Sequence, residues 1–127
     1  MVWAASEGFS LKDHASMPLA YSPPPCVCRQ ISADALNDAG IAWHGAFSSH
    51  SLEDLRAVAL SGLAVTSFTR DHLRPGMVAL DERDGMPPLP HLDFTLEYGE
   101  ADEAARPPAV AALGRLIATS GMESPRA

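Results

Sequence analysis

The sequence has 127 residues, of which 46% are hydrophobic, and this size and composition predict one globular domain, or part of one, with an apolar core. Its 16 acidic and 9 basic residues give a net charge of −7, which disfavours binding to nucleic-acid backbones and to anionic membranes. No apolar run approaches the roughly 20 residues needed to span a bilayer, and the N-terminus lacks the pattern of a signal peptide. Cys26 and Cys28 are too close for ordinary disulfide geometry, so we expect a reducing, cytoplasmic location.

In chain order, the first two strands are expected at residues 2–5 and 18–21. The second strand leads into a stiff turn of prolines, which fix φ and remove backbone donors. A helix with one apolar stripe is expected at about residues 26–39, where Gly40 ends it. Residues 41–47 then have the pattern of a third strand.

The best-defined unit follows directly. Ser51 is a good N-cap, Asp54 occupies the capping-box position, and apolar residues repeat at helical spacing after them. Gly62 supplies the positive φ that the position after a helix usually needs. Residues 63–68 are typical of a short buried strand. Together with the strand at 41–47, this order predicts a right-handed parallel βαβ crossover.

The rest of the chain is expected to hold an alternating strand and a helix. Residues 92–98 alternate apolar and polar side chains, which predicts a half-buried strand. Pro107 and Pro108 open a final helix that Gly121 ends, after an acidic loop at residues 99–106. Two short elements, a helical turn and an edge strand, are expected at residues 70–73 and 77–80, before a proline-rich connection. Alternating strands and helices predict an α/β fold with a mostly parallel sheet.

The sequence offers no catalytic set. It contains no nucleophile elbow, phosphate-binding loop, dinucleotide fingerprint or paired metal-binding histidines. Cys26 and Cys28 have no second cysteine pair and no nearby histidine, so we expect structural packing, with mild reactivity of Cys26 at a helix start as the alternative. We therefore predict no catalytic residue, no metal site and no cofactor, and a protein that is not an enzyme.

Hydroxyl side chains gather at the carboxyl ends of three predicted strands. In open α/β sheets, ligands bind outside this end of the strands. Hydroxyls combined with amides at helix N-termini suit a small anion or carboxylate. With two adjoining phenylalanines, the predicted ligand-binding residues are Ser22, Phe47, Ser48, Ser49, Thr66, Ser67 and Phe68. The alternative, that Ser48, Ser49 and Ser51 only form caps and turns, stays open at this point.

Several segments occur in an order that points to a known family. They are Met17-Pro18-Leu19-Ala20, Pro24-Pro25-Cys26 with Arg29, Ile41-Ala42-Trp43, Phe47-Ser48-Ser49, Ser51-Leu52 with Leu55, Ser61-Gly62-Leu63-Ala64-Val65-Thr66 and Gly85-Met86-Pro87-Pro88. This ordered set, across about residues 2–117, resembles the effector-binding (substrate-binding) domain of LysR-type transcriptional regulators. Where the family usually has Gly-Leu-Gly, this chain has Gly62-Leu63-Ala64, a change that should not disturb the fold.

The resemblance implies a periplasmic-binding-protein-like (type 2) fold of two α/β subdomains, joined by two crossover strands, with a small effector between them. On that template, residues 18–90 form the second subdomain. Residues 1–17 and 91–127 form the crossover strands, a C-terminal helix and a remnant of the first subdomain.

The same resemblance implies the partners. We expect a small-molecule effector, a carboxylate or an aromatic compound, and a homodimer or higher homo-oligomer. Family members bind DNA through a helix-turn-helix domain that this sequence does not contain, so we expect no DNA binding by the chain by itself and no membrane contact. The alternative function is a stand-alone small-molecule-binding or protein-interaction module.

Overall fold

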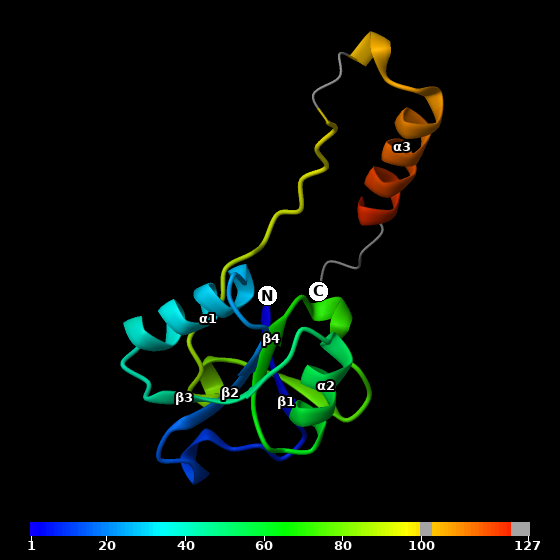
Figure 1. Cartoon of the computed structure of the whole chain (residues 1–127). Helices are drawn as coiled ribbons and strands as arrows, with labels where there is room; N and C mark the ends of the chain where they lie inside the picture. Colours follow the sequence, from blue (N-terminus) through cyan, green and yellow to red (C-terminus); the bar gives the residue numbers. More distant parts are fainter. Residues whose placement is uncertain (100–102, 123–127) are drawn as a thin grey trace. The chain divides into compact units, whose positions relative to one another are not determined.

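The computed structural model describes residues 1–99 and 103–122. In chain order its strands and helices are β1 (Val2–Ser6), β2 (Met17–Tyr21), α1 (Val27–Asp38), β3 (Trp43–Ser48), α2 (Leu52–Leu60), β4 (Thr66–Phe68), β5 (Met77–Leu80) and α3 (Pro108–Met122) (Figure 1). Short 3-10 turns add η1 (Leu11–Asp13), η2 (Arg70–His72), η3 (Glu82–Asp84) and η4 (Glu103–Ala105). The chain divides into two compact units, Met1–Leu92 and Asp93–Ala127, and each is described by itself.

Helix α2 has the predicted N-cap and closing glycine, but the capping box is incomplete, because the Ser51 amide donates to the Ser49 hydroxyl and not to the Asp54 carboxylate. The Ser51 hydroxyl accepts a hydrogen bond from the backbone amide of Asp54 (3.4 Å), which satisfies one of the free amides of the first turn. Gly62 follows the helix with φ +80°, a conformation that a residue with a Cβ rarely adopts. Helix α1 and the first two strands also lie within a residue or two of their expected places.

The strands of the first unit form a three-stranded sheet, β4-β1-β5, and a two-stranded sheet, β2-β3, which lie side by side in the order β3, β2, β4, β1, β5. Strands β2 and β3 pair in parallel, and a parallel bridge from Leu19 to Val65 connects β2 to the start of β4. Strand β1 lies between β4 and β5 and pairs antiparallel with both. The α/β class is thus confirmed, but the mostly parallel sheet is wrong. Helical crossovers produce only the parallel β2–β3 and β2–β4 contacts, whereas β1 enters the middle of the sheet in the opposite direction.

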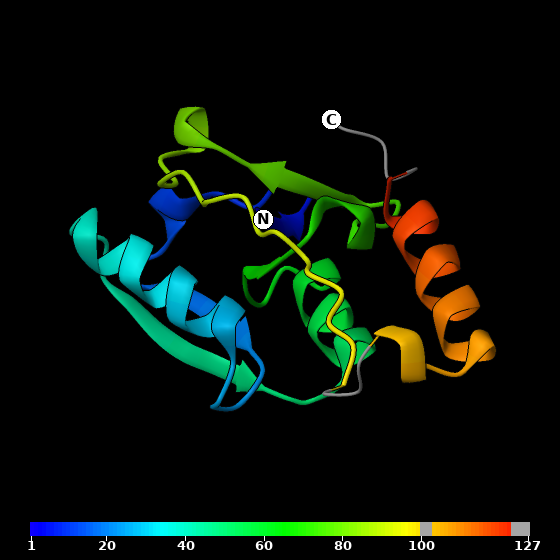
Figure 2. The same ribbon diagram turned by 90° about the horizontal axis from the view of Figure 1, so that it is seen from above.

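Helices α1 and α2 cover opposite faces of these strands (Figures 1 and 2). On the α1 face, Leu36 packs with Trp3 and Leu19, all of which are almost fully buried. On the α2 face, Ala59 packs with Ala4 and Phe68. Successive strand residues point to opposite faces, so the inner strands supply apolar side chains to the cores on both faces. Strand β3 lies at the end of this order and is exposed from His44 to Ser48.

The strand predicted at residues 92–98, which span the start of the second unit, is wrong. These residues form no strand in the described part of the chain, and Phe94 is 84% exposed. Their alternating pattern marks a face that would be buried in a sheet, but no described strand pairs with them. The Tyr98 ring instead packs under the Arg106 guanidinium, 3.6 Å from the ring centroid, and against Gly114, where any Cβ would collide with it.

Helix α3 begins at Pro108 as expected and continues through the predicted stop at Gly121 to Met122. Its apolar face is exposed at Val110, Leu113, Leu116 and Ile117. The predicted acidic loop and the last residues fall partly outside the described residues. Within residues 1–99 and 103–122, no helix is both long enough and apolar enough to cross a membrane.

Candidate ligand-binding edge

One edge of the sheet collects the carboxyl ends of β2, β3, β4 and β5, and we call it the carboxyl edge. Strand β5 runs in the same direction as β4, because both are antiparallel to β1. The amino end of β1 reaches the same edge, since Val2 is the partner of Phe68 and Trp3 the partner of Leu80. The carboxyl edge is the part of an open α/β sheet where ligands bind.

The structure brings the predicted serines of β2 and β3 together at one end of this edge. The Ser49 backbone amide donates to the Tyr21 carbonyl (3.2 Å), which holds the two strand ends side by side. Ser22 is half-buried, and Phe47 and Ser48 are exposed. These residues therefore lie at neighbouring strand ends, but Phe47 and Ser48, as successive residues of β3, point to opposite faces of the sheet.

Ser49 also belongs to the start of helix α2. Its hydroxyl donates to the Asp54 carboxylate (2.7 Å) and accepts the Ser51 backbone amide (3.1 Å). Ser49 and Ser51 therefore do serve as turn and cap residues, as the structural alternative expected. Ser48 is exposed and is the hydroxyl best placed to meet a ligand.

The predicted residues of β4 are placed differently. Thr66 and Phe68 are 1% and 4% exposed, and Phe68 packs in the core on the α2 face. The Ser67 hydroxyl lies 2.5 Å from the Ser32 hydroxyl of α1, so it joins helix to strand. The structure does not bring Thr66 and Phe68 to the surface where the serines meet, because a strand of three residues buries both sides against helices.

A cationic group that the sequence argument missed lies at the same end of the edge. The Arg29 guanidinium lies 4.8 Å from the centre of the Tyr21 ring, and the Tyr21 phenol packs over Gly45. The buried Nε of Arg29 has no hydrogen-bond partner among the described residues. Arginine in the first turn of a helix that follows a strand end was the available signal. With Ser22 and Ser48, this guanidinium makes the region suitable for an anionic group.

Cys26 and Cys28 are not part of this candidate anion-binding region. Both are free, and burial, followed by the nearby Cys26, raises the pKa of the Cys28 thiol, which keeps it protonated at neutral pH. Among the described residues, no three histidine, cysteine, aspartate or glutamate side chains lie close enough to hold a metal ion.

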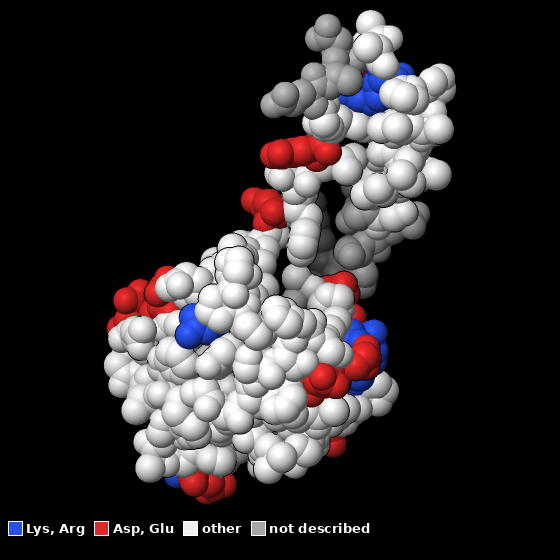
Figure 3. All heavy atoms as spheres, viewed as in Figure 1, with Lys and Arg blue, Asp and Glu red and all other residues white. Residues whose placement is uncertain are grey.

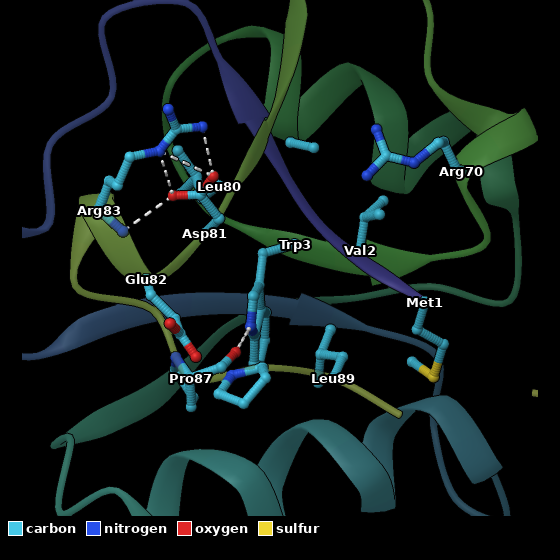
Figure 4. A pocket seen from close by; sticks show the side chains of 12 residues that line it. Met1, Val2, Trp3, Arg70, Leu80, Asp81, Glu82, Arg83, Pro87 and Leu89 are labelled. Atoms are coloured by element: carbon cyan, nitrogen blue, oxygen red, sulfur yellow. Dashed lines mark hydrogen bonds and ion pairs between the residues drawn. The ribbon is translucent and has the colours of Figure 1, made fainter. Parts of the chain in front are cut away.

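The other end of the carboxyl edge holds an open pocket of about 610 Å³ that the sequence argument also missed (Figure 4). Its walls come from the start of β1, the end of β5 and the segment after η3, which meet only in the folded chain. Trp3 Nε1 donates to the Pro87 carbonyl (2.7 Å), so this segment is fastened to β1. Val2, Leu80 and Leu89 supply apolar surface.

Charged side chains surround this pocket. The Arg83 guanidinium donates to both carboxylate oxygens of Asp81, and these bonds, with the Arg83 amide, hold the pKa of Asp81 below its usual value. The same pairing raises the pKa of Arg83. The face drawn in Figure 3 shows basic and acidic residues in small separate groups, and no continuous basic stripe among the described residues.

A mixed sheet between two helices, with polar groups along its carboxyl edge, is an α/β arrangement of the kind in which ligands bind outside the strand ends. The chain belongs to the LysR substrate binding domain family, whose model matches residues 1–120, and the family implies a periplasmic-binding-protein-like α/β fold. The chain is similar to the HTH-type transcriptional regulator PecT of Dickeya dadantii (strain 3937), with 26% identity over 95 residues. That match covers 75% of this chain and 30% of PecT, so the chain spans less than a third of its relative.

Proposed function

We propose that this chain is the effector-sensing part of a LysR-type transcriptional regulator in the cytoplasm. A small molecule binds at the β2–β3 end of the carboxyl edge, at Ser22, Phe47, Ser48 and Ser49. DNA is bound by a helix-turn-helix segment outside this sequence. The observation that carries the proposal is the hydrogen bond from Ser49 to Tyr21, because it assembles hydroxyls from separate strands beside an arginine.

The mode of action follows from linkage. A ligand shifts a conformational equilibrium only by the difference in its affinity for the two states. Ser49 is hydrogen-bonded to Asp54 and Ser51, so a ligand that engages this serine also acts on the start of α2. We propose that effector binding changes the position of α2, and that the full protein converts this change into altered transcription.

The chemistry at this end favours a carboxylate. Hydroxyl and guanidinium groups donate hydrogen bonds, and charge-assisted bonds to a carboxylate are stronger than neutral ones. Phe47 is exposed but points to the other face of β3 from Ser48, so the site favours the carboxylate group rather than an aromatic ring. No catalytic step is part of this proposal.

The test is a thermal-shift screen of small carboxylates and aromatic compounds, followed by NMR mapping of the hits on labelled chain. We expect a hit to shift the amide signals of Ser22, Ser48 and Ser49. Ser48→Ala should weaken its binding several-fold, because one hydrogen bond to a charged group is lost. Ser61→Ala, an exposed serine at the other end of α2, is the matched control and should leave affinity unchanged. A specific ligand at the opposite edge of the sheet would contradict the proposal.

A further inference from the structure

We propose that the pocket at the β1–β5 end of the carboxyl edge is a second ligand site, and that it takes a small monocarboxylate with an apolar body through Arg70. This site goes beyond the proposed function, since it shares no residue with the serine region at the β2–β3 end. Its volume of about 610 Å³ lies within the range of small-molecule pockets, roughly 300–1,000 Å³.

The charges at this pocket leave Arg70 available. The ion pairs of the described residues join Arg56 to Glu53 and Arg83 to Asp81, and Arg70 takes part in neither. Arg83 lies over the same pocket, but its charge is compensated by Asp81, to which it donates through Nε and Nη2. Figure 4 shows Arg70 and the Arg83–Asp81 pair on opposite sides of the pocket. The guanidinium that can receive a carboxylate is therefore that of Arg70.

Turn η2, which carries Arg70, is held in place by the buried Arg56 of helix α2. Arg56 of α2 is only 5% exposed, and its Nε donates to the His72 carbonyl (3.0 Å) while its Nη2 lies 3.2 Å from His72 Nδ1. The His72 ring in turn lies edge-on to Phe68 in the core, with 5.8 Å between ring centres. Turn η2 is thus fixed to both a helix and a strand, which reduces the ordering cost of binding.

The other residues of the pocket determine which kind of ligand fits beside the carboxylate group. Val2, Leu80 and Leu89 give an apolar lining, against which a ring or alkyl group is removed from water. Glu82 lies beside Pro87 on the wall away from Arg70 (Figure 4). A second carboxylate at that wall would meet a like charge, so the site favours one acidic group rather than two.

The test uses benzoate as the probe and benzyl alcohol as its uncharged counterpart, with the whole labelled chain followed by NMR. We expect benzoate to shift the amide signals of Val2, Leu80 and Leu89, and benzyl alcohol to shift them far more weakly. Arg70→Gln should weaken benzoate binding there about tenfold or more, because a charge-assisted pair is lost. Added salt should also weaken it, since Arg70 is exposed.

Arg74→Gln is the matched control. Arg74 is an exposed arginine of the same segment, but it bonds the carbonyls of Asp71 and Leu73 and does not line the pocket. Equal losses in the two variants, equal binding of benzyl alcohol, or no shifts at Val2 and Leu80 would each overturn the proposal. Shifts confined to Ser22, Ser48 and Ser49 would also overturn it while supporting the proposed effector region, so the two failures are distinguishable.

Discussion

Thr66 and Ser67 are neighbours in β4, but their hydroxyls are in opposite situations. The buried Thr66 hydroxyl has no hydrogen-bond partner in the described part of the chain, while that of Ser67 meets Ser32. A buried polar group without a partner lowers stability. We expect Thr66→Val, which keeps the shape, to raise the free energy of unfolding by about 1 kcal/mol in urea denaturation. Ser67→Ala should lower it. A destabilised Thr66→Val chain would show that this hydroxyl is satisfied.

Asp81 gives the chain an acid-sensitive turn at η3. Its pKa is lowered, first by the Arg83 side chain and then by the Arg83 backbone amide. A carboxyl whose pKa is lower in the folded state stabilises the fold above its unfolded pKa, about 3.9, and this contribution is lost as pH falls through the folded value. We expect the free energy of unfolding to decrease below about pH 4, and less steeply in Asp81→Asn.

Arg83→Gln tests the same pair from the other side. It removes the side-chain donors to Asp81, so its stability profile should flatten in the same acid range as that of Asp81→Asn. Profiles parallel to that of the unchanged chain in both variants would mean that the pair does not form in solution.

At the scale of elements, helix α2 depends on its first residues. Ser51 caps the helix through the Asp54 amide, and Ser49 supports both. We expect Ser51→Ala to lower the free energy of unfolding by about 1 kcal/mol, and Ser51→Gly by only a few tenths. Thermal and urea unfolding followed by circular dichroism measure both. Equal losses for the two variants would show that the cap is not the source of the stability.

An element can be predicted from the sequence when the residues that determine it are all close together in the chain. Helix α2 was predictable because its cap, apolar stripe and closing glycine are all local. Residues 92–98 carried an equally clear alternation, but a strand also needs a partner, and no described strand pairs with them. Local periodicity identifies the apolar face of a segment, but it does not identify the element that packs against that face.

The candidate site divides in the same way. The position of Ser22 at a strand end next to Ser48 and Ser49 was predictable, because the carboxyl ends of parallel neighbours share one edge, while ligand binding by these residues stays a prediction. The second pocket was not expected, since it depends on β1 running against its neighbours, so that Val2 lies near the end of β5. The sequence of β1 contains no signal that it runs antiparallel to its neighbours.

At the scale of the whole molecule, the second unit exposes a large apolar surface. Phe94 is 84% and Leu116 66% exposed, and each such side chain forgoes roughly 1.5–3 kcal/mol of burial. We expect the chain to form a homodimer through this unit at micromolar concentration, measured by sedimentation. The double change Phe94→Ser and Leu116→Glu should give monomer.

Leu63→Ser is the control for this prediction. Leu63 is 69% exposed in the first unit, so its loss removes a similar apolar side chain from a different surface and should leave the dimer intact. A well-folded monomer at micromolar concentration in the unchanged chain would contradict the prediction.

The central place of β1 also determines the order in which this chain can fold during translation. A ribosome delivers β1 before any other element of the first unit, but its partners Phe68 and Leu80 are synthesised only near the end of that unit. The apolar strand β1 therefore stays unpaired while β2, α1 and β3 are synthesised. Its pairing with β4 and β5 closes long loops and so occurs late in folding. Until then the nascent chain presents an unpaired strand, which is the state that chaperones recognise and that aggregates when crowded.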